Sequence, residues 1–137
     1  MDTKRILMGT LVGGIIVYAV GYLIFDLAFA NFYAANVGSA TGVARDPQLV
    51  WAVALGSLSY AALVTLAIGN RAGSSDIGAG VKIGAVVGFL LWFTVDFILY
   101  GVTNIANLAR TVVDPLLELV RGGIAGGAVA VVLGKIR

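Results

Sequence analysis

The sequence contains no cysteine and no histidine. A chain without these side chains has no thiol nucleophile, no disulfide, no imidazole base and none of the usual ligands of soft metals or haem. The hydroxyl groups of Ser57 and Ser59 fall inside an apolar segment with no base beside them. Most enzyme chemistries are thereby excluded, and we expect a non-enzymatic protein with no metal and no cofactor.

Charged residues are also scarce in this chain. They make up 12% of the 137 residues, against about a quarter in soluble domains, and 60% of the residues are hydrophobic. Apolar runs of about 20 residues are long enough to cross a bilayer as helices. The composition therefore predicts an all-α fold, an integral membrane four-helix bundle formed by one domain, residues 1–137.

The first apolar run has two interpretations. Lys4 and Arg5 precede it, and Ala28-Phe29-Ala30 has the small-x-small form of a cleavage site, as in a secretory signal peptide. Its roughly 20 residues exceed the usual 7 to 15 or so of a signal peptide, so we expect it to be retained as the first span. The expected spans are residues 6–30, 47–68, 80–108 and 115–133.

Two coincidences predict an internal repeat. Asp46-Pro47 and Asp114-Pro115, 68 residues apart, each suit an N-cap followed by the first residue of a helix. Rows at four-residue spacing, each ending in an aspartate, recur after 70 residues in the first and third spans. Together these features favour two tandem helical hairpins. The two rows are Gly14, Tyr18, Tyr22, Asp26 and Gly84, Gly88, Trp92, Asp96.

Basic residues divide unequally between the two sides of the predicted topology. Arg45 and Arg110 lie on one side, and six others lie on the side of the termini. The positive-inside rule therefore places both termini in the cytoplasm. Since the basic residues are scattered singly, they form no nucleic-acid patch, and the expected partners are the lipid bilayer and other membrane subunits. The six are Lys4, Arg5, Arg71, Lys82, Lys135 and Arg137.

Small residues recur at four-residue spacing in every predicted span and include nine of the 19 glycines. In lipid, close backbone approach through such faces supplies much of the association between helices. We expect these rows to pack the bundle internally. The alternative is a homo-oligomer formed through a row left exposed, above all that of the fourth span. The main packing candidates are Gly9, Gly13, Gly84, Gly88, Gly122 and Gly126.

A cluster of polar residues is expected in the outer half of the bundle. Asp96 lies roughly 22 Å along the third span and Arg121 about 9 Å into the fourth from the opposite side, so their depths agree. We therefore expect an Asp96 to Arg121 ion pair, with Glu118 sharing the guanidinium. Tyr100, Thr103 and Asn107 fall within about 60° of Asp96 on a helical wheel. The candidate cluster is Asp26, Asp96, Tyr100, Thr103, Asn104, Asn107, Glu118 and Arg121.

This polar cluster has three interpretations. A charged group within a span costs a few kcal/mol and is normally turned inward, paired or protonated, so the cluster can be a satisfied network that locks the helices together. It can also be a site for a small polar ligand, an ion or a lipid headgroup, open to the outer side. A proton or ion pathway is the third, although the inner half of each polar row holds glycine and aromatic residues and no acid to continue a relay.

The chain resembles a group of small, uncharacterised bacterial inner-membrane proteins with four predicted helices. In that group the first helix ends in an aspartate followed by aromatic residues, and the third carries an Asp-x-Thr-Asn element near its end. Here Asp96 stands seven residues before Thr103 instead of two. The resemblance implies the four-span topology and no particular activity. The matching residues are Asp26, Phe29, Phe32, Tyr33, Gly38, Thr103, Asn104, Glu118 and Gly122.

The sequence therefore favours a non-enzymatic membrane protein that packs against partners as an accessory subunit, or binds a lipid or small molecule through the polar cluster. The alternative is a small proton- or ion-coupled transporter or channel that uses Asp26, Asp96, Glu118 and Arg121. A membrane enzyme of unfamiliar type is a third interpretation.

Overall fold

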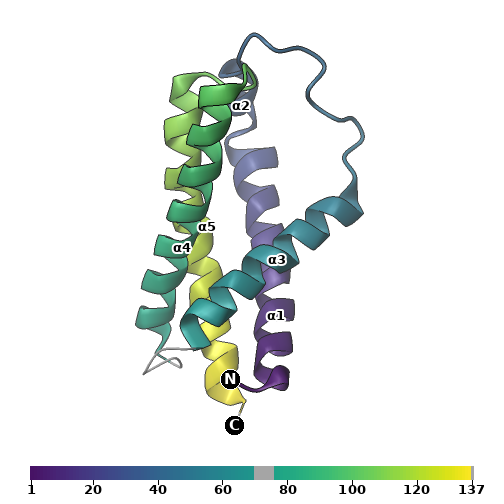
Figure 1. Cartoon of the computed structure of the whole chain (residues 1–137). Helices are drawn as coiled ribbons and strands as arrows, with labels where there is room; N and C mark the ends of the chain where they lie inside the picture. The colour runs from purple at the N-terminus through teal and green to yellow at the C-terminus, as the bar shows by residue number, and fades with distance from the viewer. Residues whose placement is uncertain (70–75, 137) are drawn as a thin grey trace.

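The computed structural model of the chain describes residues 1–69 and 76–136. Within these residues, helices form the whole architecture, and four of them are long and apolar enough to cross a membrane. The prediction of an all-α bundle with four spans is confirmed, and the chain is a multi-pass membrane protein. Both termini lie at the same end of the bundle (Figure 1). Arg71 and Arg137, which entered the topology prediction, lie outside the described residues.

The first span is not a uniform α-helix. Helix α1, Thr3–Gly21, begins at Asp2, whose carboxylate accepts the Arg5 N–H at 2.8 Å. It continues as a wider π-helical segment, η1, Tyr22–Ala28, in which the Phe29 N–H donates to the Ile24 carbonyl at 2.8 Å. A short helix, α2, Ala30–Ala35, follows. The predicted helix over residues 6–30 is therefore α-helical only as far as Gly21, and π turns of this kind are rare and often lie at functional sites.

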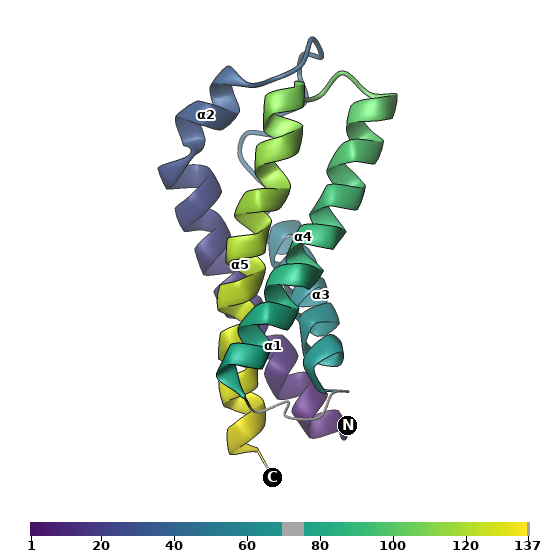
Figure 2. The ribbon, with the colours of Figure 1, turned by 90° about the vertical axis from the view of Figure 1, so that its left-hand side faces the viewer.

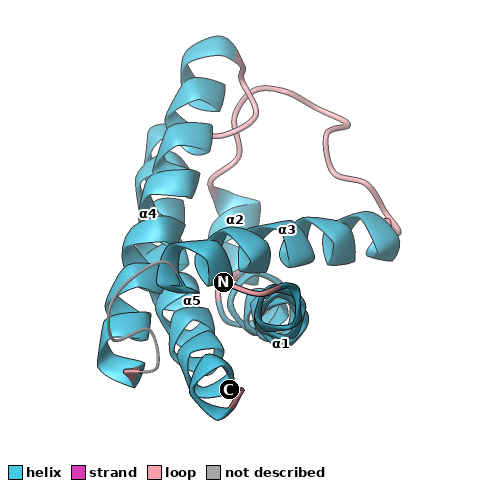
Figure 3. Ribbon diagram, turned by 60° about the horizontal axis from the view of Figure 1, so that its bottom comes forward, coloured by secondary structure: helices cyan, strands magenta, loops and turns pink. Residues whose placement is uncertain are grey.

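Helix α3 covers Val50–Gly69, so the predicted start at Pro47 is wrong. The first helical bonds run to the Leu49 carbonyl, which accepts the N–H groups of Ala52 and Val53 at 3.0 and 3.2 Å. Asp46 and Pro47 belong to the preceding connection, which arches away from the bundle (Figure 1). Helix α3 crosses α1 obliquely, and its Val50 end points away from α4 (Figure 3).

Helix α4 covers Ile77–Val102 and ends earlier than predicted. Asp76 caps its start by accepting the Gly78 N–H at 3.0 Å. At the end of the helix the Thr103 backbone is extended. The Thr103 hydroxyl donates to the Leu99 carbonyl at 2.6 Å, and so satisfies one of the carbonyl groups in the last turn of the helix. The predicted helical face shared by Asp96, Thr103 and Asn107 is therefore wrong, because the last two residues lie beyond the helix.

Helix α5 covers Leu108–Lys135 and begins seven residues before the predicted start. Asn107 is its N-cap and accepts the Arg110 N–H at 2.9 Å. Asn is as favourable as Asp at this position. Pro115 lies inside the helix, so the Asp114-Pro115 pair is not a helix start. One Asp-Pro pair lies in a connection and the other in a helix, and this support for a tandem duplication is lost.

Helices α4 and α5 lie side by side and make the closest packing in the bundle (Figure 1). A Cβ added to Gly84 would lie 2.8 Å from the Gly126 Cα, and one added to Gly88 would lie 3.2 Å from the Gly122 Cα. The two helices touch at this glycine-rich end and diverge toward the other end (Figure 2). Toward that other end, Asp96 of α4 and Arg110 of α5 line a small pocket.

The glycine row of α5 is buried against α4 within one chain. Gly122 and Gly126 are therefore used inside one chain, and a homo-oligomer formed through another surface stays a prediction. In α1, a Cβ on Gly9 would lie 2.5 Å from the Thr65 Cγ2, and one on Gly13 would lie 3.0 Å from the Ala61 Cβ. These two glycines set the close crossing of α1 and α3.

Candidate functional site

Four charged residues of α5 lie on one helical face. Arg110, Asp114, Glu118 and Arg121 are spaced by four, four and three residues, which brings them into one row. Arg121 is the fourteenth residue of the 28 in α5, so it lies roughly 20 Å from the start of the helix at about 1.5 Å per residue. It is thus near the middle of the span, deeper than a start at Pro115 had predicted.

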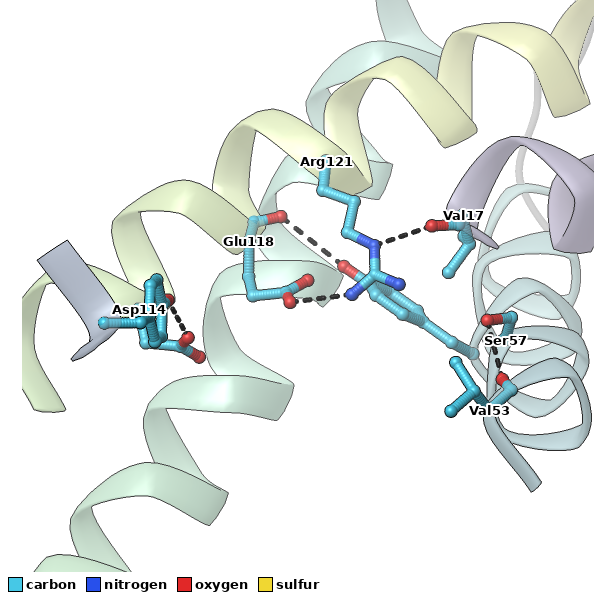
Figure 4. Close-up of polar contacts among 8 residues, drawn as sticks. Val17, Val53, Ser57, Asp114, Glu118 and Arg121 are labelled. Carbon is cyan, nitrogen blue, oxygen red and sulfur yellow. Dashed lines mark hydrogen bonds and ion pairs between the residues drawn. The ribbon is translucent and has the colours of Figure 1, made fainter. Parts of the chain in front are cut away.

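Arg121 is the centre of this row and is 9% exposed. Its Nη1 donates to the Glu118 Oε1 at 2.9 Å, and its Nε donates to the Val17 carbonyl at 2.9 Å (Figure 4). The guanidinium carbon also lies 5.4 Å from the Phe25 ring centroid and 5.6 Å from that of Tyr60. Contacts from α1, η1, α3 and α5 therefore hold the Arg121 guanidinium in place inside the bundle.

The predicted Asp96 to Arg121 ion pair is wrong. Among the described residues, the acid that pairs with Arg121 is Glu118, which is 1% exposed. Glu118 stands three residues away on the same helix, so the pair forms without any reach across the bundle. Asp96 instead lines a small pocket that Arg110 also lines, and its buried Oδ2 has no hydrogen-bond partner among the described residues.

Gly21 makes room for the Arg121 side chain. A Cβ at position 21 would lie 2.5 Å from the Arg121 Nη2 and 2.8 Å from its Cζ. Gly21 is the last residue of α1, next to the π-helical segment. No sequence pattern points to this role, because Gly21 stands outside the rows of small residues at four-residue spacing.

Asp114 links the charged row to the short helix α2. Its Oδ1 accepts a hydrogen bond from the Tyr33 hydroxyl, and the Arg110 guanidinium lies over the Tyr33 ring at 4.8 Å from the centroid. Burial, and next the hydrogen bond to Asp114, raise the pKa of the Tyr33 hydroxyl above its ordinary value. Sequence reasoning missed Arg110 and Asp114 as site residues because it placed both outside the fourth helix.

Three cavities meet at Arg121. The polar cavity, of about 330 Å³, is lined by Asp26, Trp92 and the charged row of α5. The apolar cavity, of about 550 Å³, lies among Val17, Val53, Leu63 and Leu91 and also reaches Trp92. A side groove of about 490 Å³ passes Gly21 and Gln48. Arg121 lines all three, so a polar group at this residue can have an apolar neighbour in the adjoining cavity.

Two buried atoms in the polar cavity have no hydrogen-bond partner among the described residues. They are the Glu118 Oε2, an acceptor, and the Trp92 Nε1, a donor. An unpaired buried polar group costs about 1 to 3 kcal/mol. Glu118 and Trp92, which both line the polar cavity, therefore leave one acceptor and one donor unsatisfied beside it.

The remaining predicted site residues lie farther along α4 and its connection to α5. Asp96, Tyr100 and Thr103 line a small pocket of about 80 Å³ together with Arg110. The Asn104 carbonyl accepts the Ala40 N–H at 3.0 Å. The Asn107 Nδ2 donates to the Asn36 Oδ1 at 3.0 Å, besides capping α5. The single predicted cluster is thus two groups, with Asp26, Glu118 and Arg121 in the polar cavity and the others toward the end of the bundle.

Comparison with known proteins leaves this site without a precedent. No protein-family model, curated protein or solved structure matches the chain. Across residues 1–69 and 76–136, no three Asp or Glu side chains are placed to share a metal ion. What the site can bind therefore follows from its own charges, unpaired atoms and cavities.

Proposed function

We propose that this protein is a non-enzymatic binding protein of the bacterial inner membrane, and that its ligand is an amphipathic membrane molecule. Its polar end lies at Glu118 and Arg121, and its apolar part lies in the apolar cavity. The observation that carries the proposal is the junction at Arg121 and Trp92, where a charged cavity and a larger apolar cavity share the same two residues. Ligand sites combine apolar walls with a few convergent polar groups in this way.

The apolar cavity has the size and lining that an acyl chain requires. Its volume of about 550 Å³ lies within the range of roughly 300 to 1,000 Å³ found for small-molecule sites. Its walls come from α1, α3 and α4, and Arg121 of α5 also lines it. A hydrocarbon chain there gains contacts on several sides, and a charged headgroup reaches Arg121 without leaving the bundle.

Native mass spectrometry of the protein in mild detergent tests this proposal. Leu63→Trp fills the apolar cavity, and we expect it to reduce the amount of co-purified lipid several-fold. Leu66→Trp is the matched control, because Leu66 lies on the same helix, is 42% exposed and does not line the cavity. Equal lipid retention by the two variants would contradict the proposal.

An ion or proton pathway is less well supported by the geometry. The charged row of α5 stops at Arg121, and beyond it the helix continues with Gly122, Gly126 and Ala130, all buried. The next charged residue of α5 is Lys135. A conducting path would have to cross this closely packed stretch, so proteoliposomes should show no proton leak above that of protein-free vesicles. A leak abolished by Asp96→Asn would favour transport instead.

We further propose that both termini face the cytoplasm. Lys4, Arg5, Lys82 and Lys135 support this orientation, because all four lie near the end of the bundle where the termini meet. The absence of native cysteine makes the test direct. A maleimide that cannot cross the membrane should label Thr41→Cys, in the exposed connection, in intact cells and label Lys4→Cys only after permeabilisation. The reverse pattern would invert the topology.

A further inference from the structure

The formal charges of the residues that line the polar cavity sum to minus one. Three carboxylates, Asp26, Asp114 and Glu118, line it together with two guanidinium groups, Arg110 and Arg121. Charges within a bilayer interact far more strongly than charges in water because the local dielectric constant is low. A ligand that carries only negative charge is therefore repelled, whereas a cationic group neutralises the negative charge of the cavity.

The unpaired atoms of the cavity call for more than a simple cation. The Glu118 Oε2 accepts, and an ammonium group supplies the missing donor. The Trp92 Nε1 is a donor and calls for an acceptor. The Arg121 guanidinium lines the same cavity, so an anionic acceptor suits both residues. A ligand with an ammonium and an anionic oxygen group satisfies both sets at once.

Aromatic rings add a reason for an ammonium. Phe25, Tyr33 and Trp92 line the same cavity. Aromatic faces attract ammonium groups, and they do so more strongly as water is removed. The anionic group is best matched by a phosphate, whose several oxygens can take donors from Arg121 and Trp92 together.

We infer that the polar cavity binds the ammonium-phosphate headgroup of an ethanolamine phospholipid, with the ammonium at Glu118 and the phosphate between Arg121 and Trp92. This inference rests on the proposed function, since the acyl chain of such a lipid would occupy the apolar cavity. A soluble ethanolamine phosphate has the same headgroup chemistry. The lipid is the favoured source because the apolar cavity adjoins the polar one at Arg121 and Trp92.

Lipid competition tests the inference. The purified protein is mixed with equal amounts of palmitoyl-oleoyl phosphatidylethanolamine and phosphatidylglycerol, and the retained lipid is identified by native mass spectrometry. We expect the ethanolamine lipid to be retained about tenfold over the glycerol lipid, a difference of about 1.4 kcal/mol. Glu118→Gln and Asp26→Asn each remove the excess charge, so both should abolish the preference. Asp46→Asn, an acid in the exposed connection, should leave it unchanged.

The outcomes distinguish a failure of the headgroup assignment from a failure of the proposed function. Equal retention of the two lipids by the unaltered protein would overturn the headgroup assignment and leave the binding of an amphipathic molecule intact. Retention of neither lipid would overturn both. Displacement of the lipid by millimolar phosphoethanolamine would support the headgroup chemistry and overturn the lipid as its source. Since Asp26 is exposed, Asp26→Asn keeps the test available if Glu118→Gln does not fold.

Trp92→Phe tests the phosphate contact separately. The variant keeps an aromatic ring and removes the Nε1 donor, so we expect retention of the ethanolamine lipid to fall several-fold. Phe89→Leu is a control on the same helix, because Phe89 lines none of the three cavities. Unchanged retention in Trp92→Phe would overturn the assignment of that donor.

Discussion

The guanidinium of Arg121 lies against Gly21, where a Cβ would come within 2.5 Å of the Nη2 atom. Contacts to Glu118 and Val17 hold the guanidinium, so it cannot move aside freely. We therefore expect Gly21→Ala to lower the free energy of unfolding in detergent by about 1 to 3 kcal/mol, as overpacking does elsewhere. Thermal unfolding followed by circular dichroism measures the change.

Gly56→Ala is the control for this prediction. Nothing lies within 4 Å of a Cβ at position 56, inside α3. Alanine is favoured over glycine in a helix by up to about 1 kcal/mol, so this variant should be as stable as the unaltered protein or more stable. A stabilised Gly21→Ala protein would show that the guanidinium is not confined at this position.

Removal of the Arg121 charge should be severely destabilising. Arg121→Leu leaves the carboxylate of Glu118 buried and unpaired, which costs about 3 to 5 kcal/mol. The double variant Arg121→Leu/Glu118→Leu removes both charges and should recover most of the loss. Arg45→Leu, in the exposed connection, serves as the control. A single Arg121→Leu variant that unfolds like the unaltered protein would contradict the pairing.

Tyr33 should make stability fall at alkaline pH. Its pKa is raised in the folded protein, so above about pH 10 the unfolded chain loses the hydroxyl proton while the folded protein keeps it. Deprotonation then favours the unfolded state, and the Tyr33 contribution is complete below pH 10 and declines above it. Unfolding measured from pH 8 to about pH 11 should show a smaller decline for Tyr33→Phe. The same decline in both proteins would contradict the expectation, and Tyr100→Phe is the control.

The contact between α4 and α5 should tolerate no added methyl group at Gly84. A Cβ there would meet the Gly122 carbonyl oxygen and lie 2.8 Å from the Gly126 Cα, and these are backbone atoms that move only with the whole helix. We expect Gly84→Ala to cost about 1 to 3 kcal/mol or more. Gly101→Ala lies on the same helix with nothing within 4 Å of its Cβ and should be neutral or stabilising. Similar stability of the two variants would contradict the close contact.

The sequence predicted the four spans because a bilayer demands about 20 apolar residues from each helix, and that requirement is visible in composition alone. Helix ends were harder to place. Asp114-Pro115 matches a helix start as well as Asn107 does, and only the packing of the first two turns of α5 beside Tyr33 distinguishes them. Periodicity cannot reveal a π turn, so the change at Tyr22 was not predictable.

Which polar residues meet between helices depends on the rotation of each helix about its axis and on the depth of each residue in the membrane. The predicted depths of Asp96 and Arg121 agreed only because the prediction began the fourth helix at Pro115. The helix begins at Leu108, so Arg121 lies closer to the middle of the span. Glu118 was expected to share the guanidinium because residues three apart on one helix meet wherever the helix begins. This relationship within one helix was therefore predicted correctly, while the partner of Asp96 on another helix required the structure.

The charged row of α5 also bears on how the protein is made. A charged residue near the centre of a span opposes insertion by about 2.5 to 3.5 kcal/mol. Helix α5 carries four charged residues in its first half, and Arg121 lies near its centre. Because α5 is the fourth span to be synthesised, the Val17 carbonyl, the Tyr33 hydroxyl and the glycine face of α4 have all left the ribosome before it. Biogenesis thus delivers the most costly segment last, when the groups that solvate its charges already lie in the bilayer.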